Sequence, residues 1–226
     1  MTLATRVGED GRGAWIASHL AREGISLTEG SIGRQPTSVA TSTLDATGAA
    51  AYTFDMSWEL PEVAHFEGLA HVHTGSIAAT LEPGASAVLT AIQSAGPNAT
   101  ISYDPNARPT LMGDPHEVRA KIEALIGLSD VVKASDEDIA WLYDGVPLPD
   151  ILRLWGQLGP SLTVVTRGGN GAVVGLSITG ELTSVDAPVV ELVDTVGAGD
   201  SFMARLLSGL LDAGLLCGIQ GRERLR

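Results

Sequence analysis

A carboxylate stands among small residues near the end of the chain, in the run Gly197-Ala198-Gly199-Asp200. An apolar run typical of a strand, 187–193, precedes it, and a helical pattern over 202–211 follows. Small residues at a helix start leave backbone N–H groups accessible, and the helix dipole adds partial positive charge there. The run is therefore either an ordinary glycine-rich helix start or an anion site. In an anion site, Asp200 could accept a proton from a hydroxyl that attacks phosphorus.

The longer run Asp194-Thr195-Val196-Gly197-Ala198-Gly199-Asp200-Ser201-Phe202 resembles the C-terminal signature of the ribokinase-like (pfkB) carbohydrate kinases, and of their fructokinase-like members in particular. The resemblance implies an α/β fold, ATP with Mg²⁺, and a sugar hydroxyl as phosphoryl acceptor. It places the anion hole on Gly197, Ala198 and Gly199, and the catalytic base on Asp200. It also assigns Asp194 to a monovalent-cation loop, which implies activation by K⁺. Arg205 departs from the pattern, which has Gly or Ala there, and is compatible with it on the solvent side of the helix.

Composition predicts a folded globular protein. The chain has 226 residues, 44% of them hydrophobic and 18% charged, which suits one α/β domain with a small appendage. The net charge of −13 repels nucleic acid and anionic membranes, so we expect neither as a partner. The family resemblance implies a sugar as the ligand. The family resemblance allows a homodimer. A single cysteine, Cys217, excludes an internal disulfide, and the sequence has no signal-peptide pattern, so we expect a cytoplasmic protein.

From residue 69 onward, predicted strands and helices alternate. The predicted strands are 70–74, 100–103, 131–132 and 162–166. The predicted helices are 83–93, one that starts at Pro115 behind an Asp114 cap, 135–143 and 150–158. This alternation favours a doubly wound, mostly parallel sheet flanked by helices, with ligands at the carboxyl ends of its strands. We expect a single ribokinase-like α/β domain over residues 1–226.

The N-terminal part breaks this alternation. A helix is predicted over 13–23, and then two consecutive strands over 37–43 and 49–54 with a turn at 45–48. No helix separates the two strands, so residues 30–58 are predicted to form a small antiparallel flap. In a sugar kinase such a flap would close over the sugar and exclude water.

A second glycine-rich run, Thr166-Arg167-Gly168-Gly169-Asn170-Gly171, directly follows the apolar strand 162–166. Its simplest interpretation is a turn that joins this strand to 172–176. In the ribokinase-like family a T-x-G-x-x-G element at this place lines the nucleotide, and Thr166, Gly168 and Gly171 match it. A turn can also contact a nucleotide, so the two interpretations are compatible.

The run Lys133-Ala134-Ser135-Asp136-Glu137-Asp138 follows the strand 131–132. The family has an N-x-x-E element here, in which the Asn lies near the phosphates and the acid organises Mg²⁺. Ser135 and Asp138 occupy the matching positions. The alternative is a capping box, with Ser135 as the N-cap and Asp138 at the third helical position. Both remain open, because Mg²⁺ keeps several waters and needs only one or two carboxylates.

The run Asp104-Pro105-Asn106-Ala107-Arg108-Pro109 ends another predicted strand. A proline-containing turn explains its prolines but requires neither Asn106 nor Arg108. Fructokinase-like members of the family carry a similar D-P-N-x-R element, which makes Asn106 and Arg108 candidates for contact with substrate or phosphate.

His71 and His73 lie two residues apart on a predicted strand and therefore face the same side. No third ligand with matching spacing accompanies them, so histidines that pack or donate hydrogen bonds are favoured over a metal site.

The resemblance covers nearly the whole chain but not the whole family. The run Arg6-Val7-Gly8-Glu9-Asp10-Gly11-Arg12-Gly13 is similar to an R-V-G-x-D-x-x-G segment that lies inside the family fold. The resemblance therefore predicts a chain truncated at both ends. Three functions remain open: a sugar kinase or a piece of one, a non-catalytic remnant, and another nucleotide-binding α/β protein. The absence of G-x-G-x-x-G after a first strand disfavours a dinucleotide enzyme.

Overall fold

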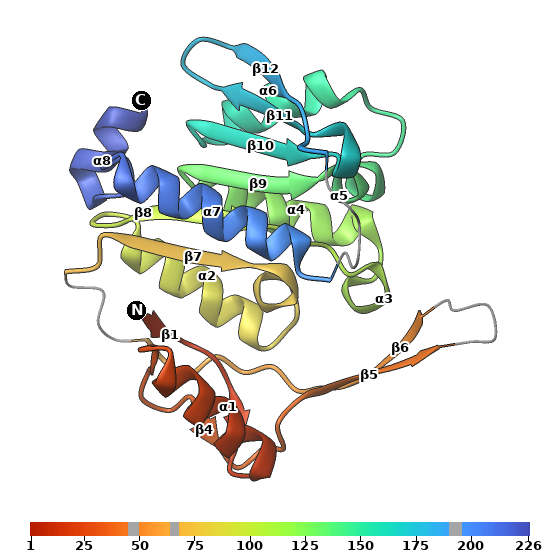
Figure 1. The fold of residues 1–226 in the computed structure, drawn as a ribbon, viewed down its shortest axis with the longest axis vertical. Coiled ribbons are helices and arrows are strands. Elements are labelled where there is room, and N and C mark those ends of the chain that lie inside the picture. Colours follow the sequence, from red (N-terminus) through yellow and green to blue (C-terminus); the bar gives the residue numbers. More distant parts are fainter. Residues whose placement is uncertain (45–49, 64–67, 190–195) are drawn as a thin grey trace. The chain divides into compact units, whose positions relative to one another are not determined.

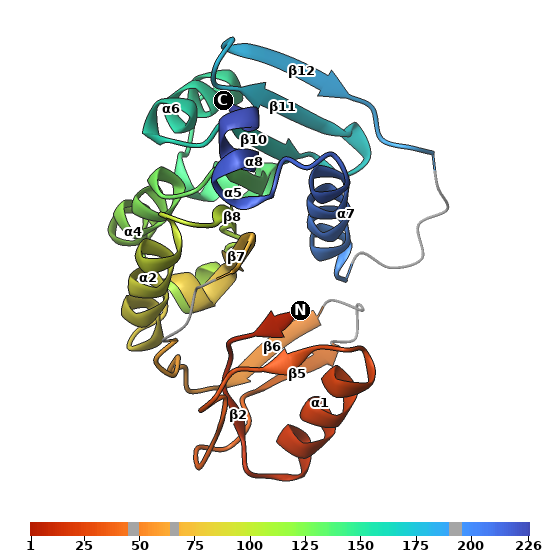
Figure 2. The ribbon, with the colours of Figure 1, turned by 90° about the vertical axis from the view of Figure 1, so that its left-hand side faces the viewer.

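The computed structural model describes residues 1–44, 50–63, 68–189 and 196–226 (Figure 1, Figure 2). The chain forms two compact units. The smaller comprises Met1–His65 with Glu82–Ala87, and the larger comprises Phe66–Leu81 with Val88–Arg226. The smaller unit holds the residues of the predicted flap, 30–58, together with the N-terminal helix and strands.

The described part of the smaller unit contains one helix and paired short strands. The helix α1 (Gly11–Arg22) confirms the one predicted over 13–23. The strand pairs are β1 (Thr2–Leu3) with β3 (Ser26–Leu27), β2 (Val7–Gly8) with β4 (Ile32–Gly33), and β5 (Val39–Leu44) with β6 (Ala50–Asp55). The antiparallel pair β5–β6 confirms the two flap strands, and the turn predicted at 45–48 lies outside the described residues.

Asp10 ties the start of α1 to the segment that leads into β5. Its Oδ1 accepts a hydrogen bond from the Gly13 N–H at 2.8 Å, and its Oδ2 accepts one from the Thr37 N–H at 2.8 Å. The Thr37 hydroxyl donates to Oδ1, also at 2.8 Å. These hydrogen bonds, the one from the Thr37 N–H above all, lower the pKa of Asp10 to about 2. The aspartate of the R-V-G-x-D-x-x-G run is thus a helix cap with a long-range partner.

The larger unit is built on a six-stranded sheet with the order β12–β11–β10–β9–β8–β7. In chain order its strands are β7 (His71–Gly75), β8 (Thr100–Asp104), β9 (Val131–Ser135), β10 (Leu162–Thr166), β11 (Ala172–Leu176) and β12 (Glu181–Val185). The first four are parallel, and β11 and β12 continue the sheet antiparallel. This confirms the predicted mostly parallel sheet of an α/β fold.

Helices cover both faces of this sheet (Figure 1, Figure 2). The helices α4 (Pro115–Gly127), α6 (Leu148–Leu158) and the part of α2 (Gly84–Ala95) from Val88 on lie on one face. The helix α7 (Ala198–Asp212) crosses the other face. The shorter elements are η1 (Ser76–Ala79), α3 (Pro109–Met112), α5 (Asp136–Leu142), η2 (Gly168–Asn170) and α8 (Gly218–Leu225).

The helix α4 forms as its sequence predicts. Asp114 is its N-cap and accepts a hydrogen bond from the His116 N–H at 2.8 Å, and Pro115 occupies the first helical position. Its buried residues form an apolar stripe at helical spacing, namely Val118, Ile122, Leu125 and Ile126. The apolar stripe therefore packs this helix against the core.

The sheet face beneath α7 changes from apolar to polar. A buried apolar cluster on this face consists of Val131, Leu162, Val164, Ala172 and Leu216, with Leu206, Leu207 and Leu210 of α7 packed against it. Side chains alternate along a strand, so Lys133 shares the face of Val131. The polar end of β9 therefore lies on the same side of the sheet as α7.

The strand β12 and the helix α8 are among the elements of the larger unit that were not predicted. The strand predicted over 187–193 is not present in its described residues, 187–189, and its remainder lies outside the described residues. Within the described ranges, no helix is long and apolar enough to span a bilayer.

Candidate active site

The polar residues that the sequence singles out follow neighbouring parallel strands at one edge of the sheet. Ser135 ends β9 and lies opposite Thr166, which ends β10. Asp104 ends β8 and lies opposite Gly75, which ends β7. The carboxyl ends of parallel strands meet at one edge, where α/β proteins bind their ligands. The strand register therefore gathers these residues from distant parts of the sequence.

The Gly197-Ala198-Gly199-Asp200 run forms the start of α7. Gly197 is the N-cap, in the left-handed conformation with φ of 73°, and no side chain caps this end of the helix. Asp200 lies in the first turn and is exposed. Asp194, the predicted cation ligand, lies outside the described residues. Arg205 is exposed, as its compatibility with the solvent side of the helix requires.

A buried ion pair lies beneath this first turn. The Lys133 Nζ donates to the Asp104 Oδ2 at 2.9 Å, with the two side chains 3% and 6% exposed. A Cβ built on Gly199 would lie 3.1 Å from the Lys133 Nζ. Burial raises the pKa of Asp104, and the Lys133 charge opposes this rise. Neither residue of this pair is among the site residues predicted from the sequence. A lysine in an otherwise apolar strand was the available signal, because a buried ammonium requires a partner.

Asp138 is part of a capping box, as one of the two interpretations predicted. Its Oδ2 accepts a hydrogen bond from the Ser135 N–H at 2.8 Å, and the Ser135 Oγ accepts one from the Asp138 N–H at 3.1 Å. The Asp138 Oδ1 accepts a further hydrogen bond, from the Ala107 N–H at 2.7 Å. The buried Asp138 carboxylate thus joins the start of α5 to the loop after β8.

Asn106 and Arg108 lie in that loop. The Arg108 Nη1 donates to the Asn106 Oδ1 at 2.8 Å and to the Asn106 and Ala107 carbonyls at 3.1 and 2.9 Å. Asn106 has a positive φ of 38°, and its N–H donates to the Asp104 Oδ1 at 3.2 Å. The exposed Arg108 is thus folded back on its own loop, whose Asn106 and Ala107 N–H groups donate to the Asp104 and Asp138 carboxylates.

The run 166–171 is the tight connection between β10 and β11, which agrees with the predicted turn. The Arg167 N–H donates to the Gly171 carbonyl at 2.7 Å, and η2 occupies the interior. Gly171 has a φ of 78°, and a Cβ there would overlap the Val185 carbonyl oxygen. Only glycine fits this position. Thr166 and Gly168 border the same edge as Ser135.

His71 and His73 make the hydrogen bonds that the sequence favoured over a metal site. The two ring nitrogens of His71 lie 2.9 Å from the Thr100 and Ser102 hydroxyls, and the His73 Nδ1 lies 2.8 Å from the Ser102 hydroxyl. Within the described ranges, no group of three or more His, Cys, Asp or Glu side chains is placed to hold a metal ion.

The burial of His71 makes stability depend on pH. Desolvation lowers the pKa of His71 from 6.5 to about 4, so between these values the unfolded chain binds more protons than the folded one. We therefore expect protonation of His71 to leave the free energy of unfolding unchanged above pH 6.5 and to lower it as the pH drops toward 4. The His71 contribution to the free energy of unfolding is at most about 3.5 kcal/mol, at about 1.4 kcal/mol per pKa unit. Urea unfolding of the wild type and His71→Gln measures it. A loss in this pH range that is equal in both proteins would assign the effect to other groups.

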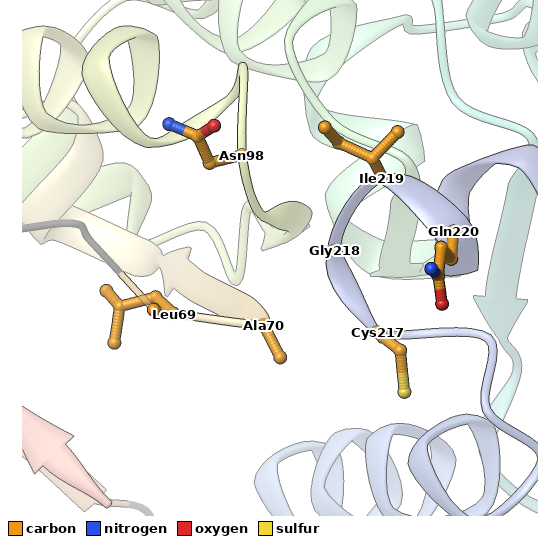
Figure 3. Close-up of a pocket in the computed structure, with 8 residues that line it drawn as sticks. Leu69, Ala70, Asn98, Cys217, Gly218, Ile219 and Gln220 are labelled. Atoms are coloured by element: carbon orange, nitrogen blue, oxygen red, sulfur yellow. The ribbon is translucent and has the colours of Figure 1, made fainter.

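A pocket of about 550 Å³ lies at the opposite edge of the larger unit, away from the residues above (Figure 3). Leu69 and Ala70, which precede β7, and Asn98, which precedes β8, line it together with the start of α8. These are the amino ends of the strands. The candidate site and this pocket are therefore separate features.

The family of the chain follows from comparison with known proteins. Residues 1–218 match the model of the pfkB family carbohydrate kinases, so the chain belongs to this family of sugar kinases. A fructokinase of Klebsiella pneumoniae is 33% identical over 221 residues, which cover 93% of this chain and 71% of the relative. The chain thus spans about 70% of that protein's length.

Solved structures agree with this assignment. The fructokinase of Vibrio cholerae O395 with fructose, ADP and calcium ion bound has a TM-score of 0.72 and 27% identity to this chain, and the match covers 91% of this chain and 69% of that one. A double mutant of the same enzyme, with fructose, ADP and potassium ion bound, gives a TM-score of 0.73 at 26% identity, covering 92% and 69%. The fold is ribokinase-like, as the signature run implied.

Proposed function

We propose that this chain transfers the terminal phosphoryl group of ATP to a hydroxyl of a sugar, with fructose as the first candidate. One observation carries the proposal: the uncapped start of α7, with Asp200 in its first turn, lies above a buried lysine at the edge where the parallel strands end. The similarity to fructokinases, one of them solved with fructose and ADP, supports this substrate class.

In this proposal the backbone N–H groups of Gly197, Ala198 and Gly199 hold the transferred phosphoryl oxygens as charge develops on them. Asp200 accepts the proton of the attacking sugar hydroxyl. Phosphoryl transfer depends on positioning and charge stabilisation, which a helix start with free N–H groups and a nearby cation can supply.

The remaining site residues would hold the nucleotide and its metal. We assign Thr166, Gly168, Gly171 and Ser135 to the nucleotide, Asn106 and Arg108 to substrate or phosphate, Asp138 to a hydrated Mg²⁺, and Asp194 to K⁺. Both Asp138 oxygens already accept backbone N–H groups, so the fit is to a metal held through water. When bound, Mg²⁺ neutralises part of the phosphate charge.

The test of the function is ADP release by the purified chain with MgATP and a panel of sugars, together with mass detection of the sugar phosphate. We expect fructose to be phosphorylated in this panel. If the chain binds ATP but forms no sugar phosphate with any sugar, the proposal is wrong and a non-catalytic remnant is the better description.

The metal assignment predicts a changed Mg²⁺ requirement. Asp138→Asn removes the charge and keeps the side-chain shape, and we expect the Mg²⁺ concentration for half-maximal ADP release to rise about tenfold, the loss of roughly one charge-assisted hydrogen bond. Asp136→Asn, an exposed position in the first turn of the same helix, is the matched control. An unchanged Mg²⁺ requirement in Asp138→Asn, with reduced thermal stability alone, would leave Asp138 only its capping role.

A further inference from the structure

Lys133 is a charged residue in the middle of β9, a strand whose buried neighbours are apolar. It is 2% exposed, and its neighbours along β9 are Val132 and Ala134, both fully buried. Desolvating an ammonium and a carboxylate is unfavourable, and apolar residues of similar size often stabilise a fold as well or better. The Lys133–Asp104 pair is therefore not explained by stability alone.

The pair is oriented with its cation toward α7. The Lys133 Nζ lies between the Asp104 Oδ2, at 2.9 Å, and the first turn of α7, where it approaches the site of a Gly199 Cβ to 3.1 Å. The Asp104 carboxylate also accepts the Asn106 N–H at 3.2 Å, on the side of the loop after β8. The positive end of the pair thus faces the helix start, and the negative end faces the loop.

The charges of Lys133 and Asp200 also act on a third group, the imidazole of His73. Desolvation lowers the pKa of His73, and the charges of Asp200 and Lys133 act on it in opposite directions, Asp200 raising it and Lys133 lowering it. The Lys133 ammonium is close to the position where a phosphate at the α7 N-terminus would carry its charge.

We propose that Lys133 is a positioning residue of the phosphoryl-transfer site: its ammonium, oriented by Asp104, supports the first turn of α7 at Gly199 and adds positive charge beneath the N–H groups that receive the terminal phosphate of the nucleotide. This inference rests on the proposed function, because it takes the start of α7 as the phosphate site. It extends that function by adding a residue that does not touch the sugar. A side chain at position 199 would crowd the ammonium, whose nitrogen lies 3.1 Å from the site of a Gly199 Cβ.

The test compares the wild type, Lys133→Met and the double variant Lys133→Met/Asp104→Leu. Dissociation constants for ATP and AMP in the presence of Mg²⁺ are measured by calorimetry, and the free energy of unfolding by urea denaturation. In both variants we expect ATP to bind about 10- to 100-fold more weakly, the range for a lost interaction with a charged group. AMP, which lacks the terminal phosphates, should change by less than about twofold, within the scatter expected for a distant contact.

Stability separates a charge effect from a structural one. The single variant leaves Asp104 buried without a partner and should unfold more easily than the double variant, in which an apolar pair replaces the ion pair. The double variant should regain stability without regaining ATP affinity. If it regains both, or if ATP and AMP weaken equally, the positioning role of Lys133 is refuted.

The same measurements separate this inference from the function on which it rests. A wild-type chain that binds ATP but phosphorylates no sugar refutes the kinase activity, while the ATP-to-AMP comparison still decides the role of Lys133. A wild-type chain that binds no ATP contradicts both.

Discussion

Replacing Asp200 with asparagine is expected to lower the rate of sugar-dependent ADP release about a thousandfold, within the range of roughly 10²–10⁴ for the loss of a general base. The substitution keeps the size of the side chain and removes its charge. Asp200 is exposed in the first turn of α7, so the fold loses only a favourable interaction with the helix dipole, about 0.3–1 kcal/mol. Steady-state kinetics with MgATP and fructose, together with ATP titration, measure the effect.

The dissociation constant for ATP separates the base from a binding residue. Removing a carboxylate near a phosphate site cannot weaken phosphate binding electrostatically, so ATP affinity should stay equal or increase in Asp200→Asn. The matched control is Asp212→Asn, an exposed aspartate at the last position of the same helix, which should leave the rate unchanged. Equal rates in wild type and Asp200→Asn would exclude Asp200 as the base.

The second large effect is expected on stability, at Arg222 of α8. Its Nε donates to the Asp130 Oδ1 at 2.7 Å and its Nη2 to the Asp130 Oδ2 at 3.0 Å. It also donates to the carbonyls of Gly96, at 2.7 Å, and Ala99. The two side chains are only 18% and 8% exposed. We expect Arg222→Leu to lower the free energy of unfolding by about 3–5 kcal/mol, because it leaves the Asp130 charge buried without its partner.

Arg224→Leu is the control for this prediction. Arg224 lies two residues further along α8, is exposed, and donates one hydrogen bond, to the Gly214 carbonyl at 3.1 Å. Loss of this hydrogen bond in Arg224→Leu should lower the free energy of unfolding by less than about 1 kcal/mol. Urea denaturation of the wild type, Arg222→Leu and Arg224→Leu measures the free energies of unfolding. If the two variants lose equal amounts of this free energy, the Arg222–Asp130 pair does not hold α8 to the sheet.

Two elements of the larger unit that the sequence predicts, β10 and α4, contain runs or stripes of buried apolar residues. The strand β10 is a short apolar run and α4 has a buried stripe with a proline-containing start, so both are readable from local sequence. The strand β12 is polar and largely exposed and forms by pairing with β11. The helix α8 is held through Arg222, which is 92 residues from Asp130 in the sequence. Both of these elements depend on tertiary contacts that no local pattern contains.

Part of the candidate site could likewise be predicted from local sequence, and part of it depends on tertiary contacts. The edge at which Ser135 and Thr166 meet could be predicted, because parallel strands present their carboxyl ends together. The pairing of Lys133 with Asp104 could not. These residues are 29 positions apart, and only the three-dimensional pairing of β8 with β9 brings their side chains together. The sequence indicates that a buried lysine needs a partner but does not say which one.

In the proposed site, the glycine at the start of α7 would give a bound phosphate a second role. Most helices begin with a Ser, Thr, Asp or Asn whose side chain accepts the first N–H groups, whereas Gly197 has no such side chain. A phosphate that accepts these N–H groups therefore completes the helix and acts as its missing cap. Nucleotide binding and the order of this turn are then one equilibrium, and amide hydrogen exchange at residues 199–201 should slow in proportion to nucleotide occupancy.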